Sequence, residues 1–460
     1  MIAVPGFGGR KVAVLGLARS GRAAVTALAA GGAEVLAWDD SDKTREGLGA
    51  EIPLCDPALI DWHEVAVLVL SPGIPHSFPQ PHAAVVAARA AGVPIIGDIE
   101  LLGRAQPQAR YIGITGTNGK STTTALIGHI LATAGQRLEV GGNLGPPALG
   151  LAPLDADGTY VLEMSSFQLE LLDTLAFDIA VLLNITPDHL DRHGDMAGYA
   201  AAKRRIFAGQ AADATAIIGV DDAICRDFAE ELRRTSKARI VPVSVQKPVP
   251  GGVYIDDGWV VDALDGGAQH VFALAGAPRL PGVHNAQNIA AAYAAARRAG
   301  VASDAAVTGI SSFPGLAHRQ ELVDTIDGVR YINDSKATNA DAAEKALACY
   351  EAIYWIVGGL PKAGGITPLA PFFTRLRHAF LIGNATGEFA ATLEGKVSYS
   401  RCGDLATALA AASDRARGEH VPDAVVLLSP ACASYDQFPN FEVRGDTFRR
   451  LVGGLPGAHR

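Results

Sequence analysis

The chain has 460 residues, a length that suits about three domains of ordinary size. Hydrophobic residues make up 49% of it and charged residues 19%, which is typical of a globular, soluble protein and excludes a disordered one. A formal net charge of −9 argues against general binding of nucleic acids or anionic membranes, so an anionic ligand would need local positive charge from loops and helix ends.

The cysteines and the apolar runs indicate the compartment. The five cysteines are scattered and include no C-x-x-C pair, so we expect no disulfide framework and no zinc site, and predict a reducing cytoplasm. The apolar segment 11–17 is short and is interrupted at once by Arg19 and Arg22, which does not fit a signal sequence. No apolar run reaches the roughly 18 residues that a membrane span requires.

Residues 1–97 alternate strand and helix patterns. The turn after the first strand, residues 16–21, approximates G-x-G-x-x-G with an alanine at the middle glycine. The second strand ends in Asp39, about 20 residues further on, where a Rossmann unit places a ribose or base contact. A third strand empties into the Pro/Gly loop 71–75, at the carboxyl end where such sheets bind ligands. These patterns predict a Rossmann-like nucleotide-binding domain, with a plain α/β domain without a ligand as the alternative.

A phosphate-binding loop is predicted next along the chain. The apolar strand 111–114 gives way to the glycine loop 116–119, then to Lys120 and Ser121, and then to a pattern over 122–131 that predicts an amphipathic helix. In such a loop the backbone N–H groups converge on an anion, Lys120 reaches the terminal phosphates and Ser121 offers its hydroxyl to Mg²⁺. The strict pattern has a further glycine at the end of the strand, which this chain lacks, so an ordinary glycine-rich turn is the alternative.

Two later strand ends carry side chains that suit a metal or a phosphate. Asn143 lies in the glycine loop 141–145, and Glu163 ends the strand pattern 160–163. A carboxylate at a strand end beside a phosphate loop can bind Mg²⁺ directly or through water. A capped strand end is the alternative explanation of Glu163.

The loop after the next buried strand is rich in titratable residues. His189 has Asp188, Asp191 and His193 near it in the sequence, which favours a site at His189. The two aspartates also fit solvated loop acids, and we do not assign them as ligands.

Two helices carry polar residues that have two explanations each. The helix pattern 196–207 contains Lys203 in a basic run, which by itself is typical of a solvated face. Asn285 and Asn288 lie three residues apart where an alanine-rich helix begins, so they share a face that suits contact with a base or a phosphate. N-capping by Asn285 alone is the alternative.

Residues 313–460 restart the alternation of strands and helices. Arg319 offers a planar fork that suits a phosphate. Strand ends dense in polar side chains follow at 333–339, 358–362 and 429–441. Because parallel strands end at the same edge of a sheet, we expect these turns to form one ligand-facing edge. Cys432 has no assignable histidine partner, so a packed thiol is expected there and not a nucleophile.

Together these motifs resemble the Mur ligases, the ATP-dependent enzymes that add amino acids to peptidoglycan precursors. The likeness spans the whole chain and rests on residues 113–122, 163–168, 184–189, 284–288, 318–319, 334–339 and 429–438. It implies an α/β protein with a Rossmann-like UDP-sugar domain over 1–97, a central P-loop ATPase-type domain over 98–314 and a C-terminal Rossmann-like amino-acid domain over 315–460.

The resemblance also implies substrates and cofactors. Residues 334–339 and 429–441 look most like those of the member that adds D-glutamate, which implies UDP-N-acetylmuramoyl-L-alanine and D-glutamate as substrates. The implied cofactors are ATP, two Mg²⁺ and a CO₂-derived carbamate on Lys203. A bare ammonium would repel Mg²⁺, whereas a carbamate resembles a carboxylate ligand. A monomer is expected by the same analogy.

Site residues follow from the resemblance position by position. ATP would be bound by Gly116, Thr117, Asn118, Gly119, Lys120, Ser121, Thr122, Asn285, Asn288, Arg319 and Asp334. The metal ligands would be Ser121, Glu163, His189 and Lys203 as its carbamate. The catalytic residues would be Lys120, His189 and Lys203. The UDP-sugar and the amino acid would be bound by Ser20, Asp39, Gly73, Asn143, Ser165, Thr338, Lys362, Ser434 and Phe441.

Two departures and three rivals stand beside this interpretation. Asp40-Ser41 stands where the family often has Thr-Arg, and Leu360-Pro361 stands where an acid and a glycine are common. The rivals are a sister ligase that adds a different amino acid, a folylpolyglutamate synthase and a P-loop regulatory protein without ligase activity. A folate enzyme would lack the N-terminal Rossmann-like domain, and a regulatory protein would not need His189 and Lys203 near the loop.

Overall fold

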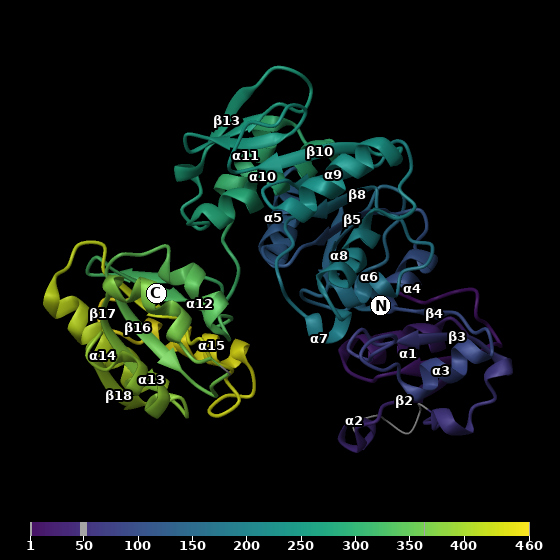
Figure 1. Cartoon of the computed structure of the whole chain (residues 1–460), viewed down its shortest axis with the longest axis horizontal. Coiled ribbons are helices and arrows are strands. Elements are labelled where there is room, and N and C mark those ends of the chain that lie inside the picture. Colours follow the sequence, from purple (N-terminus) through teal and green to yellow (C-terminus); the bar gives the residue numbers. More distant parts are fainter. Residues whose placement is uncertain (1, 47–52, 363, 460) are drawn as a thin grey trace. The chain divides into compact units, whose positions relative to one another are not determined.

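The computed structural model describes residues 2–46, 53–362 and 364–459, which form three sheets with helices packed on them (Figure 1). These residues divide into two compact units, one made of Met1–Ala277 with Asn285–Phe313 and the other of Pro278–His284 with Pro314–Arg460. The predicted α/β class is confirmed, while the boundaries at 97 and 314 stay a prediction. Within the described ranges, no helix combines the length and the apolar character that crossing a membrane needs.

The N-terminal sheet is parallel and has the strand order β2-β1-β3-β4. Its strands are β1 (Lys11–Leu15), β2 (Glu34–Trp38), β3 (Val65–Leu70) and β4 (Ile95–Ile96). Its helices are α1 (Arg19–Ala30), α2 (Asp42–Glu46), α3 (Ala83–Ala90) and α4 (Asp98–Ala105). Side chains of α1 share one core with Val12 and Val14 of β1, whereas those of α3 share another with Ala13 and Leu15. The sheet is therefore covered on both faces, as a Rossmann-like domain requires.

The central sheet has the strand order β13-β12-β11-β10-β9-β8-β5-β7-β6. Its strands are β5 (Arg110–Thr115), β6 (Leu138–Gly142), β7 (Thr159–Glu163), β8 (Ile179–Leu182), β9 (Thr215–Gly219), β10 (Arg239–Ser244), β11 (Val253–Asp256), β12 (Trp259–Asp262) and β13 (Gln269–Ala273). The strands from β6 to β11 pair in parallel, and β11, β12 and β13 form an antiparallel meander. The strand before the predicted phosphate loop, β5, lies between β7 and β8, so the loops after all three reach one edge.

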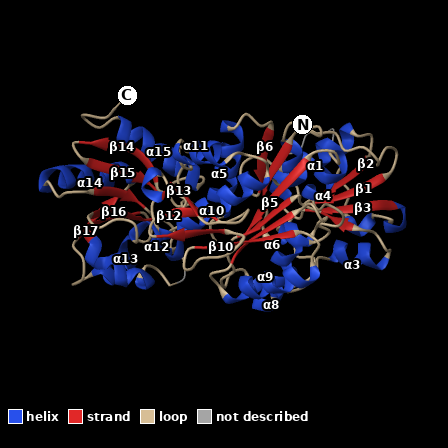
Figure 2. Cartoon of the chain, turned by 90° about the horizontal axis from the view of Figure 1, so that it is seen from above, coloured by secondary structure: helices blue, strands red, loops and turns tan. Residues whose placement is uncertain are grey.

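Helices cover both faces of the central sheet. They are α5 (Lys120–Thr133), α6 (Ser166–Glu170), α7 (Leu190–His193), α8 (Met196–Arg204), α9 (Ala223–Thr235), α10 (Val283–Arg298) and α11 (Ser303–Ser311). Figure 2 shows α5 and α11 on one side of the strands and α8 and α9 on the other. The prediction that this helix is amphipathic is wrong, because α5 has no exposed face: none of its residues before Ala132 is exposed. The reason is that α11 packs on its outer side, where Gly309 lies so close to Ile130 that a Cβ would stand 2.8 Å from its Cα.

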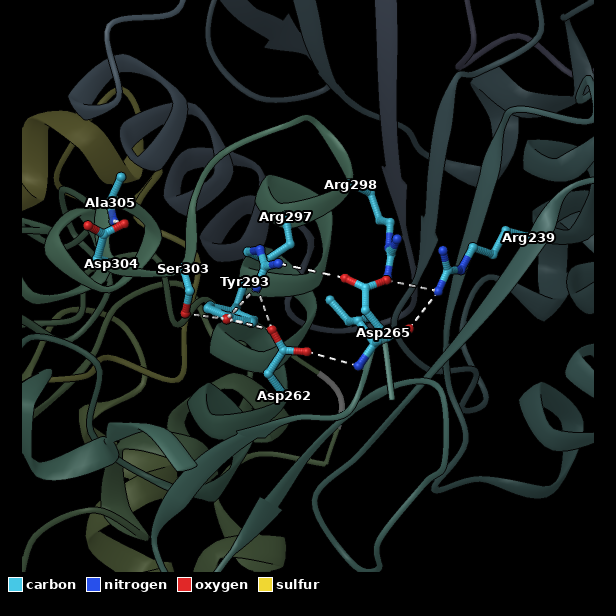
Figure 3. A network of polar contacts seen from close by, with 10 residues as sticks. Arg239, Asp262, Asp265, Tyr293, Arg297, Arg298, Ser303, Asp304 and Ala305 are labelled. Atoms are coloured by element: carbon cyan, nitrogen blue, oxygen red, sulfur yellow. Dashed lines mark hydrogen bonds and ion pairs between the residues drawn. The ribbon is translucent and has the colours of Figure 1, made fainter. Parts of the chain in front are cut away.

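A polar network fastens the antiparallel meander to α10 (Figure 3). Asp262 at the end of β12 accepts hydrogen bonds from Tyr293 at 2.7 Å and from Arg297 at 2.6 Å. Asp265, just beyond, pairs with Arg297 at 3.7 Å and accepts from Arg298 at 3.0 Å. Several charge-assisted bonds converge here, so the far end of α10 is held at the meander while its first turns reach the phosphate loop.

The C-terminal sheet has the strand order β14-β15-β19-β16-β17-β18, and only the pairing of β14 with β15 is antiparallel among its described strands. The strands are β14 (Glu321–Ile326), β15 (Val329–Asn333), β16 (Ile353–Gly358), β17 (Leu376–Ile382), β18 (Tyr399–Gly403) and β19 (Val425–Leu428). The helices α12 (Ala340–Leu347) and α13 (Thr386–Leu393) share one core with the sheet, and α14 (Leu405–Glu419) and α15 (Phe441–Gly453) share another. This is again a sheet covered on both faces, and the predicted Rossmann-like character of the C-terminal part is confirmed.

One buried carboxylate fastens α4 to the central domain. The Glu100 side chain is fully buried and accepts the backbone N–H groups of Asp173, Thr174 and Leu175 at 3.0 to 3.2 Å. It also accepts from Thr174 Oγ1 at 2.6 Å and from Arg104 Nε at 2.8 Å. Burial alone would raise the pKa of Glu100, but these hydrogen bonds outweigh it and the pKa is lowered.

We expect Glu100→Gln to lower the free energy of unfolding by about 2–4 kcal/mol, because an amide NH₂ group would face backbone donors. Since the folded-state pKa lies below the unfolded value of about 4.3, the carboxylate stabilises the fold fully above that pH and loses its effect as the pH falls through the folded pKa. Urea titrations should therefore show different free energies of unfolding for wild type and variant at neutral pH, and equal ones in acid. Glu231→Gln is the control, because Glu231 pairs with Arg204 at a partly exposed position. An equal loss of stability in this variant would contradict the role assigned to Glu100.

Candidate active site

The loop between β5 and α5 has the backbone of a phosphate-binding loop. Gly116 has φ 151° and Gly119 has φ 85°, conformations that glycine adopts without strain. A Cβ at Gly119 would lie 2.2 Å from Asn288 Oδ1, so the loop also needs glycine there for close packing against α10. Lys120 begins α5, which places its backbone N–H and the helix dipole at the loop.

Polar side chains brace this loop from neighbouring strand ends. Asn184, after β8, accepts a hydrogen bond from Asn118 N at 2.9 Å and donates to Gln287 Oε1 at 2.9 Å. Thr117 Oγ1 accepts from Thr186 N at 3.0 Å and lies 3.2 Å from the Tyr199 hydroxyl. The loop conformation is thus fixed by side chains as well as by its glycines.

Two lysines meet at this loop. The ammonium of Lys120 donates to Gly116 O and Thr117 O, both at 2.9 Å. Lys203 reaches the same carbonyl of Gly116 at 2.8 Å from α8, and its side chain is 1% exposed. Burial, and next the neighbouring charge of Lys120, lower the pKa of Lys203 to about 7. The solvated face that a basic run by itself suggests is therefore wrong for Lys203.

An aromatic ring links Lys203 to His189. Lys203 Nζ lies 4.7 Å from the centroid of the Tyr199 ring, and the His189 ring lies 6.5 Å from it. His189 has φ 51°, a left-handed conformation that is unusual for a residue other than glycine, and its ring is also 5.0 Å from that of Phe167. The structure thus brings His189 and Lys203 to the same tyrosine ring beside the phosphate loop.

Glu163 presents a buried carboxylate oxygen at the same edge. It ends β7 and is 3% exposed; its Oε1 accepts from Asn143 Nδ2 at 2.6 Å, and its Oε2 is buried without a hydrogen-bond partner. A buried carboxylate oxygen with an open coordination position fits a hard cation such as Mg²⁺. Ser121, which is 6% exposed, stands in the first turn of α5, two residues after Gly119. The described residues contain no cluster of three or more His, Cys, Asp or Glu arranged to bind a metal by themselves.

The two asparagines of α10 pack against the start of α5. Asn288 Oδ1 accepts from Thr123 Oγ1 at 3.2 Å, and Asn288 Nδ2 donates to Asn285 Oδ1 at 3.0 Å. Both are buried, and Asn285 is the third residue of α10. The alternative of N-capping by Asn285 is therefore wrong, and the prediction that the two share one face is confirmed.

The N-terminal residues lie at the carboxyl edge of their sheet. Both oxygens of Asp39 accept backbone N–H groups, from Leu17 at 2.7 Å and from Ser41 at 2.9 Å. Ser20 stands in the first turn of α1 and lines a recess together with Asp98. The Gly73 carbonyl accepts from Arg192 Nη1 of α7 at 3.5 Å.

The C-terminal unit gathers its predicted residues at the carboxyl ends of β15, β16 and β19. Asp334 accepts from Ser429 Oγ at 2.8 Å; burial raises its pKa to about 7, while Arg319 acts to lower it. Paired backbone bonds between Leu360 and Ala433 bring the turn of Lys362 beside that of Ser434. Phe441 lies beside the turn after β15, because Ser335 Oγ donates to Phe441 O at 2.8 Å, and Thr338 belongs to that same turn, where its N–H donates to Lys336 O at 2.8 Å.

Several residues that the sequence did not single out belong to these edges. Arg444 of α15 is 1% exposed and donates to Ser335 O and Cys432 O, which ties two predicted turns together. Tyr199 stands four residues before Lys203 on one helix, a spacing that places both on one face and could have identified it. Asn184 belongs to the motif 184–189, but the motif by itself assigns no role to its side chain. For Arg444 the sequence carries no comparable signal.

Ser165 keeps a structural role in addition to its predicted one. Its hydroxyl accepts from Gln168 N at 3.2 Å and the Gln168 side chain accepts from Ser165 N, which forms a capping box at the start of α6. Cys432 is buried, and burial raises the pKa of its thiol, as expected for a packed cysteine.

Comparisons with known proteins agree with this geometry. A family model described as the Mur ligase middle domain matches residues 114–296. The UDP-N-acetylmuramoylalanine–D-glutamate ligase of Paramagnetospirillum magneticum is 52% identical over 453 residues, which cover 98% of this chain and 98% of that protein. The enzyme of the same name from a Caulobacter species is 52% identical over 471 residues, which cover both chains fully.

Solved structures of lower identity share the fold. The UDP-N-acetylmuramate–alanine ligase of Thermotoga maritima superimposes with a TM-score of 0.57 at 16% identity and covers 96% of this chain and 98% of its own. A UDP-N-acetylmuramoyl-L-alanyl-D-glutamate–2,6-diaminopimelate ligase gives a TM-score of 0.56 at 20% identity, with 89% and 98% covered. The phosphate loop and its two lysines agree with the full-length likeness to the two D-glutamate ligases. The chain therefore belongs to the Mur ligase family.

Proposed function

We propose that this protein is the ligase that joins D-glutamate to UDP-N-acetylmuramoyl-L-alanine, with ATP converted to ADP and phosphate. The observation that carries the proposal is the meeting of Lys120, Lys203 and the open carboxylate oxygen of Glu163 at one phosphate loop. The full-length likeness to relatives named as D-glutamate ligases supports the choice of amino acid.

A carboxylate is a poor electrophile, so amide formation requires that it be activated first. In the proposed reaction the alanyl carboxylate attacks the γ-phosphate of ATP, which forms an acyl phosphate and releases ADP. The amine of D-glutamate then attacks the acyl carbon, and phosphate leaves from the tetrahedral intermediate. Lys120 and the N-terminus of α5 stabilise the charge that develops on the transferred phosphoryl group.

Two Mg²⁺ ions are part of the proposal, and the buried, unpartnered Oε2 of Glu163 supports the first of them. Ser121 and Glu163 would hold one of them, and His189 with Lys203 as its carbamate would hold the other. When bound, Mg²⁺ neutralises phosphate charge and acts as a Lewis acid. An unprotonated amine adds CO₂ to form a carbamate and a proton, and the burial of Lys203 beside Lys120 favours the unprotonated form.

The remaining site residues bind and orient the substrates. Within the first unit, Ser20, Asp39, Gly73, Asn143 and Ser165 would bind the UDP-sugar, and the phosphate loop with Asn285 and Asn288 would bind ATP. Within the second unit, Arg319 and Asp334 would contact the nucleotide, and Thr338, Lys362, Ser434 and Phe441 would bind D-glutamate. We propose a cytoplasmic monomer.

An ADP-release assay with UDP-N-acetylmuramoyl-L-alanine tests the function. ADP should form with D-glutamate, while L-glutamate and diaminopimelate should give no more than the background rate. Turnover of UDP-N-acetylmuramoyl-L-alanyl-D-glutamate with diaminopimelate or lysine would instead identify a sister ligase, and turnover with a folate substrate would identify a folate enzyme. ATP binding without any turnover would favour a regulatory protein.

We expect Lys120→Ala to lower kcat by about 10³-fold or more, because the phosphoryl transfer loses a fixed positive charge. Binding of the UDP-sugar should stay within twofold, since the N-terminal sheet is untouched. Turnover and calorimetric binding of the UDP-sugar measure the two effects. The exposed Lys237→Ala is a control of equal charge change, and near-normal turnover of Lys120→Ala would contradict the role.

We expect Lys203 to carry a carbamate. Protein equilibrated with ¹³C-bicarbonate should give a carbamate carbon signal by NMR, and Lys203→Arg should abolish both this signal and most of the turnover, because a guanidinium cannot replace an anionic ligand. Lys237→Arg should leave both unchanged. A wild-type protein that turns over but shows no carbamate would contradict the assignment.

A further inference from the structure

The backbone is strained on both sides of Arg319. His318 has φ 62° and Gln320 has φ 44°, so two residues with side chains adopt the left-handed conformation in a stretch of three. Such a conformation is held only where the surroundings determine it, and it occurs preferentially at functional sites. The contacts that hold His318 and Gln320 therefore determine where Arg319 points.

The His318 ring fits a closed socket. His318 is 6% exposed, and a Cβ at Gly445 of α15 would lie 2.1 Å from its Nδ1, so only glycine leaves room for the ring. The Phe441 ring stands edge-on at 6.2 Å between centroids. Asp446 lies 3.6 Å from His318 Nε2. The socket thus admits one position of the imidazole.

Asn333, the last residue of β15, holds the inner side of this socket. It is fully buried, and its Nδ2 lies 3.0 Å from His318 Nδ1, 3.0 Å from Glu321 Oε2 and 3.2 Å from Gly445 O. Its Oδ1 accepts from Ser335 N at 3.2 Å. We assign the ring proton of neutral His318 to Nε2, the nitrogen that faces Asp446, so that Nδ1 accepts from Asn333 Nδ2.

Further bonds carry the position of His318 to the whole turn. Glu321 Oε2, the second acceptor of Asn333, also accepts from His318 N at 2.9 Å. His318 O accepts from Lys336 N at 3.0 Å, and Gln320 N donates to Asp334 Oδ1 at 3.2 Å. Every hydrogen bond in this set joins the turn around Arg319 to Asn333, to the residues just after it or to Glu321.

We infer that Asn333 is a positioning residue for ATP binding: through the His318 ring and Glu321 it holds the strained turn that presents the Arg319 guanidinium to the nucleotide. It touches no substrate itself. The inference rests on the proposed function for the role of Arg319, and it adds the residue on which that role depends.

Two variants test it in the full-length protein. Asn333→Asp keeps the shape and the acceptor for Ser335 N but places an oxygen against Glu321 and Gly445 O, and Asn333→Ser removes the donor. For both we expect the KM for ATP, and the Kd for Mg·ADP by calorimetry, to rise at least about tenfold, while the KM values for the UDP-sugar and D-glutamate stay within about twofold. Ser413→Ala is the matched control, because it removes a buried hydrogen bond of 2.7 Å from Tyr331, two residues earlier on the same strand. It should leave the nucleotide affinity unchanged.

A double-mutant cycle separates positioning from general stability. If Asn333 acts through Arg319, Asn333→Ser combined with Arg319→Ala should bind Mg·ADP no more weakly than Arg319→Ala alone. Full additivity would overturn the inference, as would nucleotide affinity within twofold of wild type in both single variants. Loss of folded protein in both single variants, with Ser413→Ala folded, would also overturn it, because the network would then serve folding. The Mg·ADP titration decides these outcomes without turnover, whereas absence of ADP release by the wild type would refute the proposed function.

Discussion

Two lysine side chains share one carbonyl oxygen at the phosphate loop of the first unit. Lys120 and Lys203 donate to Gly116 O at 2.9 and 2.8 Å from different helices. Like charges held this close repel, and burial together with the neighbouring charge of Lys120 lowers the pKa of Lys203. The arrangement has an excess of positive charge that an anion can neutralise. A triphosphate beside Lys120 and a carbamate on Lys203 would each add negative charge at this point and relieve the repulsion.

The fold produces this meeting through strand order. Because β5 lies between β7 and β8, the phosphate loop, Glu163 and Asn184 emerge side by side although they are far apart in the sequence. The helix α8 then returns Lys203 to the loop from the opposite face of the sheet to α5. The loop that presents this carbonyl needs glycine, because Gly116 and Gly119 have positive φ and a Cβ at Gly119 would lie 2.2 Å from Asn288 Oδ1.

Much of this could be predicted from the sequence, because strand ends and glycine loops are local signals. The phosphate loop, the carboxyl edge near Glu163 and the polar turns of the C-terminal part follow from short apolar runs that end in polar residues. Burial by distant elements could not be predicted. Because α11 packs on α5, a helix that looks amphipathic in the sequence is buried. In the basic run of α8, the Lys203 side chain points inward and is buried. The role of Asn333 depends on α15, more than 100 residues later, and no spacing in the sequence relates the two.

The two departures from the family pattern have different structural consequences. Leu360 uses its N–H and its carbonyl to pair with Ala433, at 2.9 and 3.2 Å, so the turn before Lys362 is held by main-chain bonds. Pro361 lacks an N–H, but the pairing does not need one there, and the side chains at 360 and 361 can change without loss of these main-chain bonds. The other departure, Asp40-Ser41, directly follows Asp39. Both oxygens of Asp39 accept backbone N–H groups, which fixes its carboxylate beside Asp40 and Ser41, the residues at which this chain departs from the family pattern.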